Sequence, residues 1–233
     1  MDVVQPVSFA VMVALAEVWR GVGVVPDGVV GHSQGEIAAA YVAGVLSLED
    51  AARIVVHRSR LIATELAGTG GMTAITASID RVDSLLSGVH EGGADRAVVA
   101  AVNGPASVVV SGPLAVLDRL EARCDREGLR VRRVAVDYAS HGPQVERLRG
   151  GLLGVLEGVR RGVGRVPVFS TVVGRWVDGV EMDAAYWFRN LREPVGFGSA
   201  VAGLVGEGFS SFVEVSAHPV LVGAVEGVVE EAG

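Results

Sequence analysis

The stretch that decides the fold is GVVGHSQGE, residues 28–36. Two valines lead into a Gly-x-Ser-x-Gly turn, and an alanine-rich segment, residues 36–43, follows at once. This pattern between a strand and a helix is typical of a nucleophile elbow, in which the serine sits in strained backbone geometry and its glycine neighbours let the turn close. We therefore predict that Ser33 is a nucleophile at a helix N-terminus, where the N–H of Gln34 can stabilise an oxyanion. A purely structural glycine turn is the alternative.

Composition narrows the class of protein. The chain has 233 residues, a formal net charge of −7 and 50% apolar residues, which fits one large domain or one domain with an insert. Its basic residues are all arginines and are scattered, which argues against a nucleic-acid-binding face. Cys124 is the single cysteine, so an internal disulfide and a cysteine-rich zinc site are excluded, and we expect no metal. The longest apolar run is too short for a membrane span and the start lacks a signal-like charge, so we expect a cytoplasmic protein without membrane contact.

Strands and helices alternate along most of the chain, which predicts an α/β fold with a parallel sheet. We expect helices at residues 6–21 (buried), 36–43, 47–66, 143–158, 184–191 and 198–208, and strands at 24–30, 166–171 and 212–215, with an arginine-containing turn after the second strand.

The middle of the chain has a different order of predicted strands and helices. Strands are expected at residues 72–77, 97–102, 107–110 and 130–136, and helices at 80–86 and 114–126. The order βαββαβ is the split pattern of ferredoxin-like folds. We therefore predict a small subdomain, residues 72–136, inserted into a large one made of residues 1–71 and 137–233.

A serine is inert at neutral pH without a base. Among the five histidines, His141 lies after a strand and before a helix, and the ends of strands are where α/β sites assemble. His218, also at a predicted strand end, is the alternative. We assign a packing role to His32 and no special role to His57 or His90.

Several ordered blocks carry a resemblance to a known family. The blocks GHSQGE (residues 31–36), YASH (138–141) and YWFRNLREPV (186–195) resemble the acyltransferase domain of modular type I polyketide synthases, which is related to malonyl-CoA:acyl-carrier-protein transacylases. The resemblance extends over essentially the whole chain and includes NGP (103–105) and VVVSG (108–112). It implies an α/β-hydrolase-like large subdomain and a ferredoxin-like small one.

The resemblance also implies roles for individual residues. Ser33 corresponds to the acyl-carrying nucleophile and His141 to its base. The imidazole is held in the family by a main-chain carbonyl instead of a carboxylate, at the position of Asn190. Arg58 corresponds to the arginine that binds the free carboxylate of the extender unit, a role that suits a planar guanidinium. Gln5 corresponds to a glutamine that lines the acyl pocket.

The block before the base bears on substrate choice. Tyr138 and Ser140 resemble the methylmalonyl-selective form of the motif, whereas the malonyl-selective form reads His-Ala-Phe-His. Gln34 and the DVV that precedes Gln5 agree with this assignment. A phenylalanine at position 140 would fill the space beside the acyl α-carbon, and serine leaves room for a methyl branch.

The implied function is transfer of an extender unit, methylmalonyl or malonyl, from coenzyme A through an acyl-serine to the phosphopantetheine thiol of an acyl carrier protein. The coenzyme A thioester is the substrate, no cofactor is expected, and the partners are the carrier protein and neighbouring synthase domains. One alternative is a serine hydrolase, which needs a carboxylate behind its histidine. The other is a catalytically impaired fragment of a synthase.

The sequence departs from the family at both ends. It starts after the segment that carries a Gly-Gln-Gly motif and a second oxyanion donor, whose loss costs about 10²–10³ in rate, and it stops before a further strand. We therefore expect a trimmed domain. Gly142 and Ala217 stand where the family often has serine and proline.

Overall fold

A computed structural model of the chain describes residues 2–89 and 96–232. The helices of this part are α1 (Val4–Gly21), α2 (Gly35–Val42), α3 (Leu48–Leu61), α4 (Ile79–Ser87), α5 (Leu114–Arg126), α6 (Arg149–Leu156), α7 (Ala184–Arg192), α8 (Phe197–Gly206) and α9 (Val222–Ala232). The strands are β1 (Val29–Val30), β2 (Gly71–Ile75), β3 (Val98–Gly104), β4 (Ser107–Gly112), β5 (Val131–Arg133), β6 (Val168–Ser170) and β7 (Arg175–Val177). A π-helical turn, Ile62–Leu66, extends α3, and 3-10 segments lie at Pro143–Leu148 and Gly179–Glu181. None of the helices in these ranges is long and apolar enough to cross a membrane.

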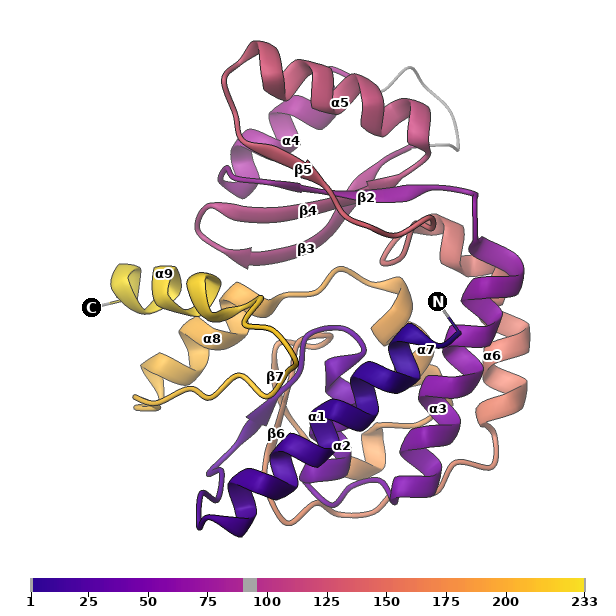
Figure 1. The fold of residues 1–233 in the computed structure, drawn as a ribbon, viewed down its shortest axis with the longest axis vertical. Coiled ribbons are helices and arrows are strands. Elements are labelled where there is room, and N and C mark those ends of the chain that lie inside the picture. Colours follow the sequence, from indigo (N-terminus) through magenta and orange to yellow (C-terminus); the bar gives the residue numbers. More distant parts are fainter. Residues whose placement is uncertain (1, 90–95, 233) are drawn as a thin grey trace.

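The predicted α/β class is confirmed, with two sheets in the described part of the chain. The lower sheet has the order β1-β6-β7, and α1, α2, α3, α6 and α7 surround it (Figure 1). Its core buries Trp187, Ile37 and Ile54 completely or nearly so. Helix α3 begins where predicted, because the Ser47 side chain accepts the N–H of Asp50 at 3.0 Å.

The upper sheet is antiparallel and has the order β3-β4-β2-β5. Helices α4 and α5 pack on one of its faces (Figure 1), around a separate apolar core that includes Leu85, Leu117 and Leu120. The element order βαββαβ and this strand order confirm the ferredoxin-like pattern. The division of the chain into two subdomains at residues 72 and 136 stays a prediction.

The two sheets meet through the segment before α8. Val195 donates its N–H to the Ala100 carbonyl and accepts the N–H of Val102, so this segment lies along strand β3. Gly198 approaches Gly104 so closely that a Cβ would lie 3.1 Å from its Cα. A small apolar cluster, Ala101, Val195, Phe197, Val201 and Val228, fills this junction. The carboxyl end of β1, where the serine elbow lies, faces the junction.

Several expectations about the fold are wrong. Helix α1 forms but is not buried, since only Gln5 and Phe9 on it are buried and its other apolar side chains are partly or fully exposed. The lower sheet is mixed: β1 and β6 are parallel, but the expected arginine-containing turn continues into β7, which returns antiparallel to β6. Gly174, at φ +69°, makes this tight return possible.

Another error concerns the C-terminal region. Residues 212–215 form no strand in the structure, and helix α9, which we did not predict, follows them. The Glu214 carboxylate accepts the N–H groups of Val220, Leu221 and Val222, so this segment caps the start of α9 instead of joining a sheet. The strand at 24–30 is reduced to Val29–Val30, and the first six residues of the helix expected at 143–158 are 3-10 helical.

The geometry of the elbow predicts that its two glycines differ sharply in how well each tolerates a side chain. A Cβ on Gly31 would lie 2.2 Å from Glu36 Cα and 2.3 Å from Glu36 N, whereas a Cβ on Gly35 would meet nothing closer than Met12 Sδ at 4.0 Å. We expect Gly31→Ala to destabilise the protein by about 3 kcal/mol, since the clash is with backbone. Gly35→Ala, the matched control, is expected to be neutral or stabilising because alanine favours the helix. Urea unfolding measures both, and equal stability of the two variants contradicts this account.

Candidate active site

The serine elbow has the strained geometry that its sequence pattern predicts. Ser33 has φ +53° and His141 has φ +56°, and these are the two non-glycine residues with positive φ in the described part of the chain. Such conformations cost of order 1–3 kcal/mol each and persist where the surroundings enforce them, often at functional sites. At Ser33 the enforcing feature is Gly31, which brings β1 against the start of α2.

The two strained residues face each other. Ser33 Oγ lies 2.8 Å from His141 Nε2, although 108 positions separate them in the sequence. His141 Nδ1 lies 2.8 Å from the carbonyl oxygen of Glu193, which can only accept a hydrogen. Neutral His141 therefore carries its proton on Nδ1, and its Nε2 is free to accept the hydrogen of Ser33.

The imidazole is held in its neutral form. The pKa of His141 is lowered to about 3, mainly by burial and in addition by the Arg58 cation, while the hydrogen bond to the Glu193 carbonyl offsets part of the effect. A neutral imidazole beside the serine hydroxyl is the state that a general base requires.

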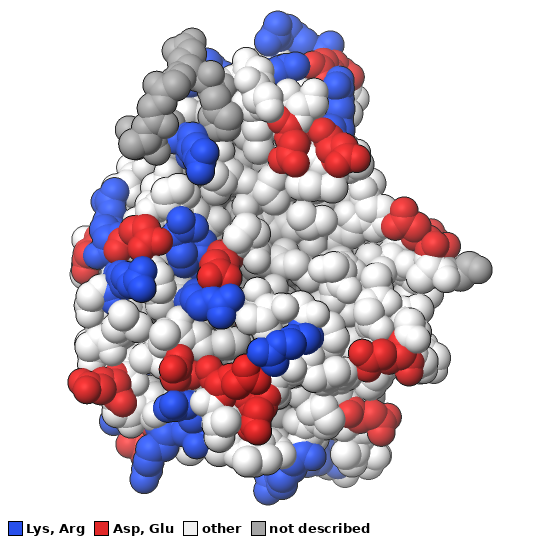
Figure 2. Space-filling model, turned by 180° about the vertical axis from the view of Figure 1, so that it is seen from behind, with Lys and Arg blue, Asp and Glu red and all other residues white. Residues whose placement is uncertain are grey.

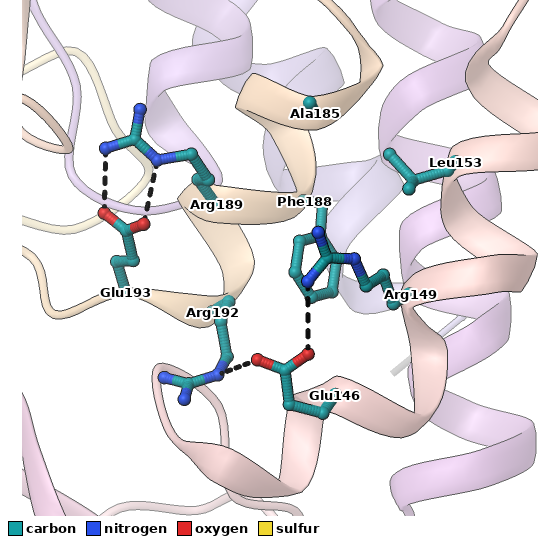
Figure 3. Close-up of a pocket in the computed structure, with 8 residues that line it drawn as sticks. All are labelled: Glu146, Arg149, Leu153, Ala185, Phe188, Arg189, Arg192 and Glu193. Carbon is teal, nitrogen blue, oxygen red and sulfur yellow. Dashed lines mark hydrogen bonds and ion pairs between the residues drawn. The ribbon is translucent and has the colours of Figure 1, made fainter.

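The prediction that Asn190 supplies the carbonyl for His141 is wrong. The residue that does so is Glu193, three positions later, because α7 continues through Arg192 and its last turn brings the following carbonyl to the imidazole. The Glu193 side chain points outward and is clamped by Arg189, with contacts of 2.8 and 3.1 Å (Figure 3). This ion pair fixes the residue whose main chain orients His141.

Arg58 comes from the last turn of α3 and is 2% exposed. Its Nη2 donates to Ser33 Oγ at 3.1 Å, and its Nη1 donates to Asn190 Oδ1. Burial lowers the pKa of Arg58 to about 10, so the side chain stays a cation at neutral pH. Because the guanidinium can only donate, Ser33 must accept from it and donate to His141, which fixes the direction of the serine hydroxyl.

Asn190 contributes its side chain to the site. Its Nδ2 donates to the Ser33 carbonyl at 3.1 Å and to Glu36 Oε2 at 2.6 Å. Glu36, completely buried, also receives the Tyr186 hydroxyl at 2.8 Å and the Thr171 N–H at 3.2 Å on Oε1. Burial raises the pKa of Glu36 to about 7, and these hydrogen bonds limit the rise.

The remaining predicted pocket residues surround this centre less directly. Gln5 Nε2 donates to the Tyr138 hydroxyl at 3.2 Å, and both residues are buried. Tyr138 is close enough to Arg58 for that cation to oppose the rise in the pKa of Tyr138 that burial causes. Ser140 is buried as well, but its hydroxyl contacts Met72 Sδ on β2 at 3.3 Å.

Several residues of this site carry buried polar atoms without hydrogen-bond partners. Six buried side-chain polar atoms of the described residues have no hydrogen-bond partner, and three of them are Gln5 Oε1, Gln34 Oε1 and Arg58 Nε. Native proteins rarely leave buried polar groups unpaired, so such a concentration indicates a site built for a polar ligand.

Among the described histidines, only His141 forms a hydrogen bond with Ser33 Oγ. His32 bonds the Asn103 side chain at 2.7 Å and packs edge-on against Phe197, as its predicted packing role requires. His218 is exposed at the turn before α9, and His57 lies on α3. His90 lies outside the described residues.

A cavity of about 350 Å³ lies on the far side of α7, between α6 and α7 (Figure 3). Its charged groups pair with one another: Glu146 bonds Arg192 at 2.7 Å and lies 3.7 Å from Arg149, which in turn covers the Phe188 ring. Arginines and carboxylates are likewise interspersed over the face shown in Figure 2. The cavity is thus separate from Ser33, and each of its charged side chains is paired with another one in its lining.

Known proteins are similar to this chain in sequence and in fold. The acyl transferase domain family matches residues 1–233. The chain belongs to this family. It is 55% identical over 232 residues to erythronolide synthase EryA2 of Saccharopolyspora erythraea, covering 100% of this chain and 6% of that protein. The resemblance to polyketide synthase acyltransferase domains is confirmed, and the chain spans only a small part of the length of these relatives.

Solved structures agree with the assignment. The acyltransferase domain from module 8 of the salinomycin polyketide synthase superposes with a TM-score of 0.95 at 50% identity, covering 100% of this chain and 54% of that one. A loading acyltransferase from the avermectin polyketide synthase also gives 0.95, at 41% identity, covering 99% and 72%. The protein therefore has the fold of a polyketide synthase acyltransferase domain.

Reasoning from the sequence missed Glu36, Tyr186 and Thr171 as parts of the site. The signal for Glu36 was present, since it is the one acid in the otherwise apolar stretch GEIAAAYV of α2. An acid in such a helix must be buried with partners, or the helix must have an exposed face. The partners themselves lie 135 and 150 positions away and had no local signal.

The depressed pKa of His141 predicts a pH dependence of stability. Between pH 6.5 and about 3 the unfolded chain binds a proton on this imidazole and the folded protein does not, so stability is lost as the pH falls through this window. We expect the stability of the wild type relative to His141→Gln to fall by about 2 kcal/mol between pH 8 and pH 5. Glu36 titrates in both proteins, so its contribution cancels. Urea unfolding at the two pH values measures the difference, and a pH-independent difference contradicts the burial argument.

Proposed function

We propose that this acyltransferase moves an α-carboxyacyl extender unit from coenzyme A to the phosphopantetheine thiol of an acyl carrier protein through an acyl-Ser33 intermediate. The observation that supports it best is the arrangement around Ser33 Oγ, with His141 Nε2 at 2.8 Å and Arg58 Nη2 at 3.1 Å. One neighbour accepts the hydroxyl proton, and the other is a buried cation suited to a carboxylate.

In the first half-reaction, Ser33 Oγ attacks the thioester carbonyl carbon while its proton moves to His141 Nε2. The N–H of Gln34, for which the described residues offer no acceptor, is placed to stabilise the oxyanion. The C–S bond then breaks, and the sulfur of coenzyme A takes the proton from His141. The Glu193 carbonyl stabilises the transient imidazolium through Nδ1–H.

In the second half-reaction, the carrier thiol gives its proton to His141 and attacks the acyl-serine carbonyl. The ester C–O bond breaks and the proton returns to Ser33 Oγ, which regenerates the free enzyme. Both steps are acyl transfers between oxygen and sulfur, so they balance without a metal or a redox group, and we propose none. The carrier protein and neighbouring synthase domains are the proposed partners, and a single cysteine is compatible with a cytoplasmic setting.

A serine hydrolase is less well supported by the geometry. Hydrolytic triads place a carboxylate on Nδ1 of the histidine, whereas here the partner is a main-chain carbonyl. Methylmalonyl is the proposed extender unit, on the basis of Tyr138 and Ser140.

Intact-mass spectrometry after addition of methylmalonyl-CoA tests the reaction. We expect a single acyl adduct that persists in water and is removed by a pantetheine thiol. Ser33→Ala should abolish the adduct with little change in stability, because the Ser33 side chain is only partly buried. Adduct formation by Ser33→Ala at the wild-type level refutes the role of Ser33, and rapid loss of the adduct in water favours the hydrolase.

Extender-unit choice is tested by competition between methylmalonyl-CoA and malonyl-CoA. One methyl group in an apolar pocket is worth about 1–3 kcal/mol, so we expect a preference for methylmalonyl of about 10–200-fold. Tyr138→His combined with Ser140→Phe should shift the ratio toward malonyl by reducing the space beside the acyl α-carbon. A wild-type ratio at or below one refutes the methylmalonyl assignment and leaves the acyltransferase assignment unchanged.

A further inference from the structure

Arg58 is a buried cation without a direct counter-charge. No carboxylate of the described residues lies within ion-pair distance of it, and its guanidinium donates to Ser33 Oγ and Asn190 Oδ1. A charged group in this environment needs well-directed hydrogen bonds and a compensating charge nearby. Whatever fixes the Asn190 amide therefore also fixes the guanidinium.

The Asn190 amide has two possible orientations, and its neighbours select one. The Arg58 guanidinium can only donate, so it requires the amide oxygen. The Glu36 carboxylate and the Ser33 carbonyl lie on the other side, at 2.6 and 3.1 Å, and require the amide nitrogen. The shorter of these two contacts is the one to the carboxylate, which as a charged acceptor is also the stronger partner.

Glu36 is itself held as an acceptor. Its Oε1 receives the Thr171 N–H and the Tyr186 hydroxyl, and its Oε2 receives Asn190. Three donors and complete burial leave the carboxylate one arrangement, in which it lies one amide away from Arg58 and supplies a negative charge above its pKa of about 7. The electrostatic influence of Glu36 on Arg58 favours the charged form of the arginine, which is the expected sign.

We propose that Glu36 is a positioning residue for Arg58: acting through the Asn190 amide, it orients the guanidinium toward the carboxylate of the incoming acyl group. The inference rests on the proposed function, and it assigns to the acid of the GHSQGE block a part in recognition of carboxylated acyl groups. Glu36 does not touch the substrate, and its effect is largest for substrates that carry a carboxylate for Arg58, because any effect that passes through the Arg58 contact with Ser33 is common to all substrates.

The experiment compares kcat/KM for methylmalonyl-CoA and propionyl-CoA, which differ in the carboxylate. For Glu36→Gln we expect the ratio of the two kcat/KM values to fall about tenfold, since a misdirected guanidinium weakens binding and orientation of the carboxylate, whereas any effect on Ser33 is shared by both substrates and cancels in the ratio. Asn190→Leu removes the link while leaving Glu36 in place, and it should lower the ratio as far. Arg58→Ala shows how far this ratio falls when the guanidinium is removed completely.

Two further variants separate positioning from general support of the fold. Asn190→Asp places two carboxylates in contact and should lower the ratio, whereas the double variant Glu36→Gln, Asn190→Asp restores a donor opposite an acceptor and keeps one negative charge. The ratio of kcat/KM for methylmalonyl-CoA to that for propionyl-CoA should therefore be higher in the double variant than in Asn190→Asp. The matched control is Glu121→Gln, which removes a carboxylate bonded to Thr73 and Arg133 in the upper sheet and should leave the ratio unchanged.

The outcomes are distinguishable. Equal loss for both substrates in Glu36→Gln and Asn190→Leu, or a double variant no better than Asn190→Asp, overturns the proposal even if the wild type transfers methylmalonyl normally. A wild type that forms no acyl-serine with either substrate overturns the proposed function first, and the positioning role with it.

Discussion

The constraint on which the rest of the structure depends is the contact between strand β1 and helix α2 at Gly31. A side chain there would overlap the backbone of Glu36, so the chain can turn this tightly only with glycine. The tight turn forces Ser33 to φ +53°, which raises its hydroxyl out of the elbow. It also leaves the N–H of Gln34 at the start of α2 and drives Glu36 inward. The close contact at Gly31 thus determines the positions of the Ser33 hydroxyl, the Gln34 N–H and the buried Glu36 carboxylate.

The charges of the site follow from this burial. Arg58 and Glu36 carry opposite charges and are both almost inaccessible to water, but the Asn190 amide separates them. A direct ion pair would neutralise Arg58 and leave it less able to attract a substrate carboxylate. The bridging amide keeps the compensating charge close enough to stabilise the cation while leaving guanidinium N–H groups available. The same cation helps keep His141 neutral.

Much of this could be predicted from the sequence because the signals are local. The elbow, the cap at Ser47, and the βαββαβ order depend on residues within a few positions of one another, and all are seen in the structure. The pairing of Ser33 with His141 needed a choice among five histidines, since contacts over 108 positions leave no local trace. The resemblance to a family resolved that choice, but it placed the carbonyl for His141 three residues too early. Helix α1 was expected to be buried because apolar spacing shows that a helix has an apolar face without showing what covers it.

The hydrogen bond between His141 and the Glu193 carbonyl helps to explain why an acyl-serine at this site should react with a thiol and not with water. A carboxylate on Nδ1 stabilises the imidazolium and makes the histidine a stronger base, whereas a neutral carbonyl does so less. Burial and the Arg58 cation weaken the base further. A thiol with a pKa of about 8.5 is far easier to deprotonate than water, at about 15.7. A weak base therefore discriminates between the two: it still assists the carrier thiol in the proposed second step but gives little help to water, so the environment of His141 favours transfer over hydrolysis.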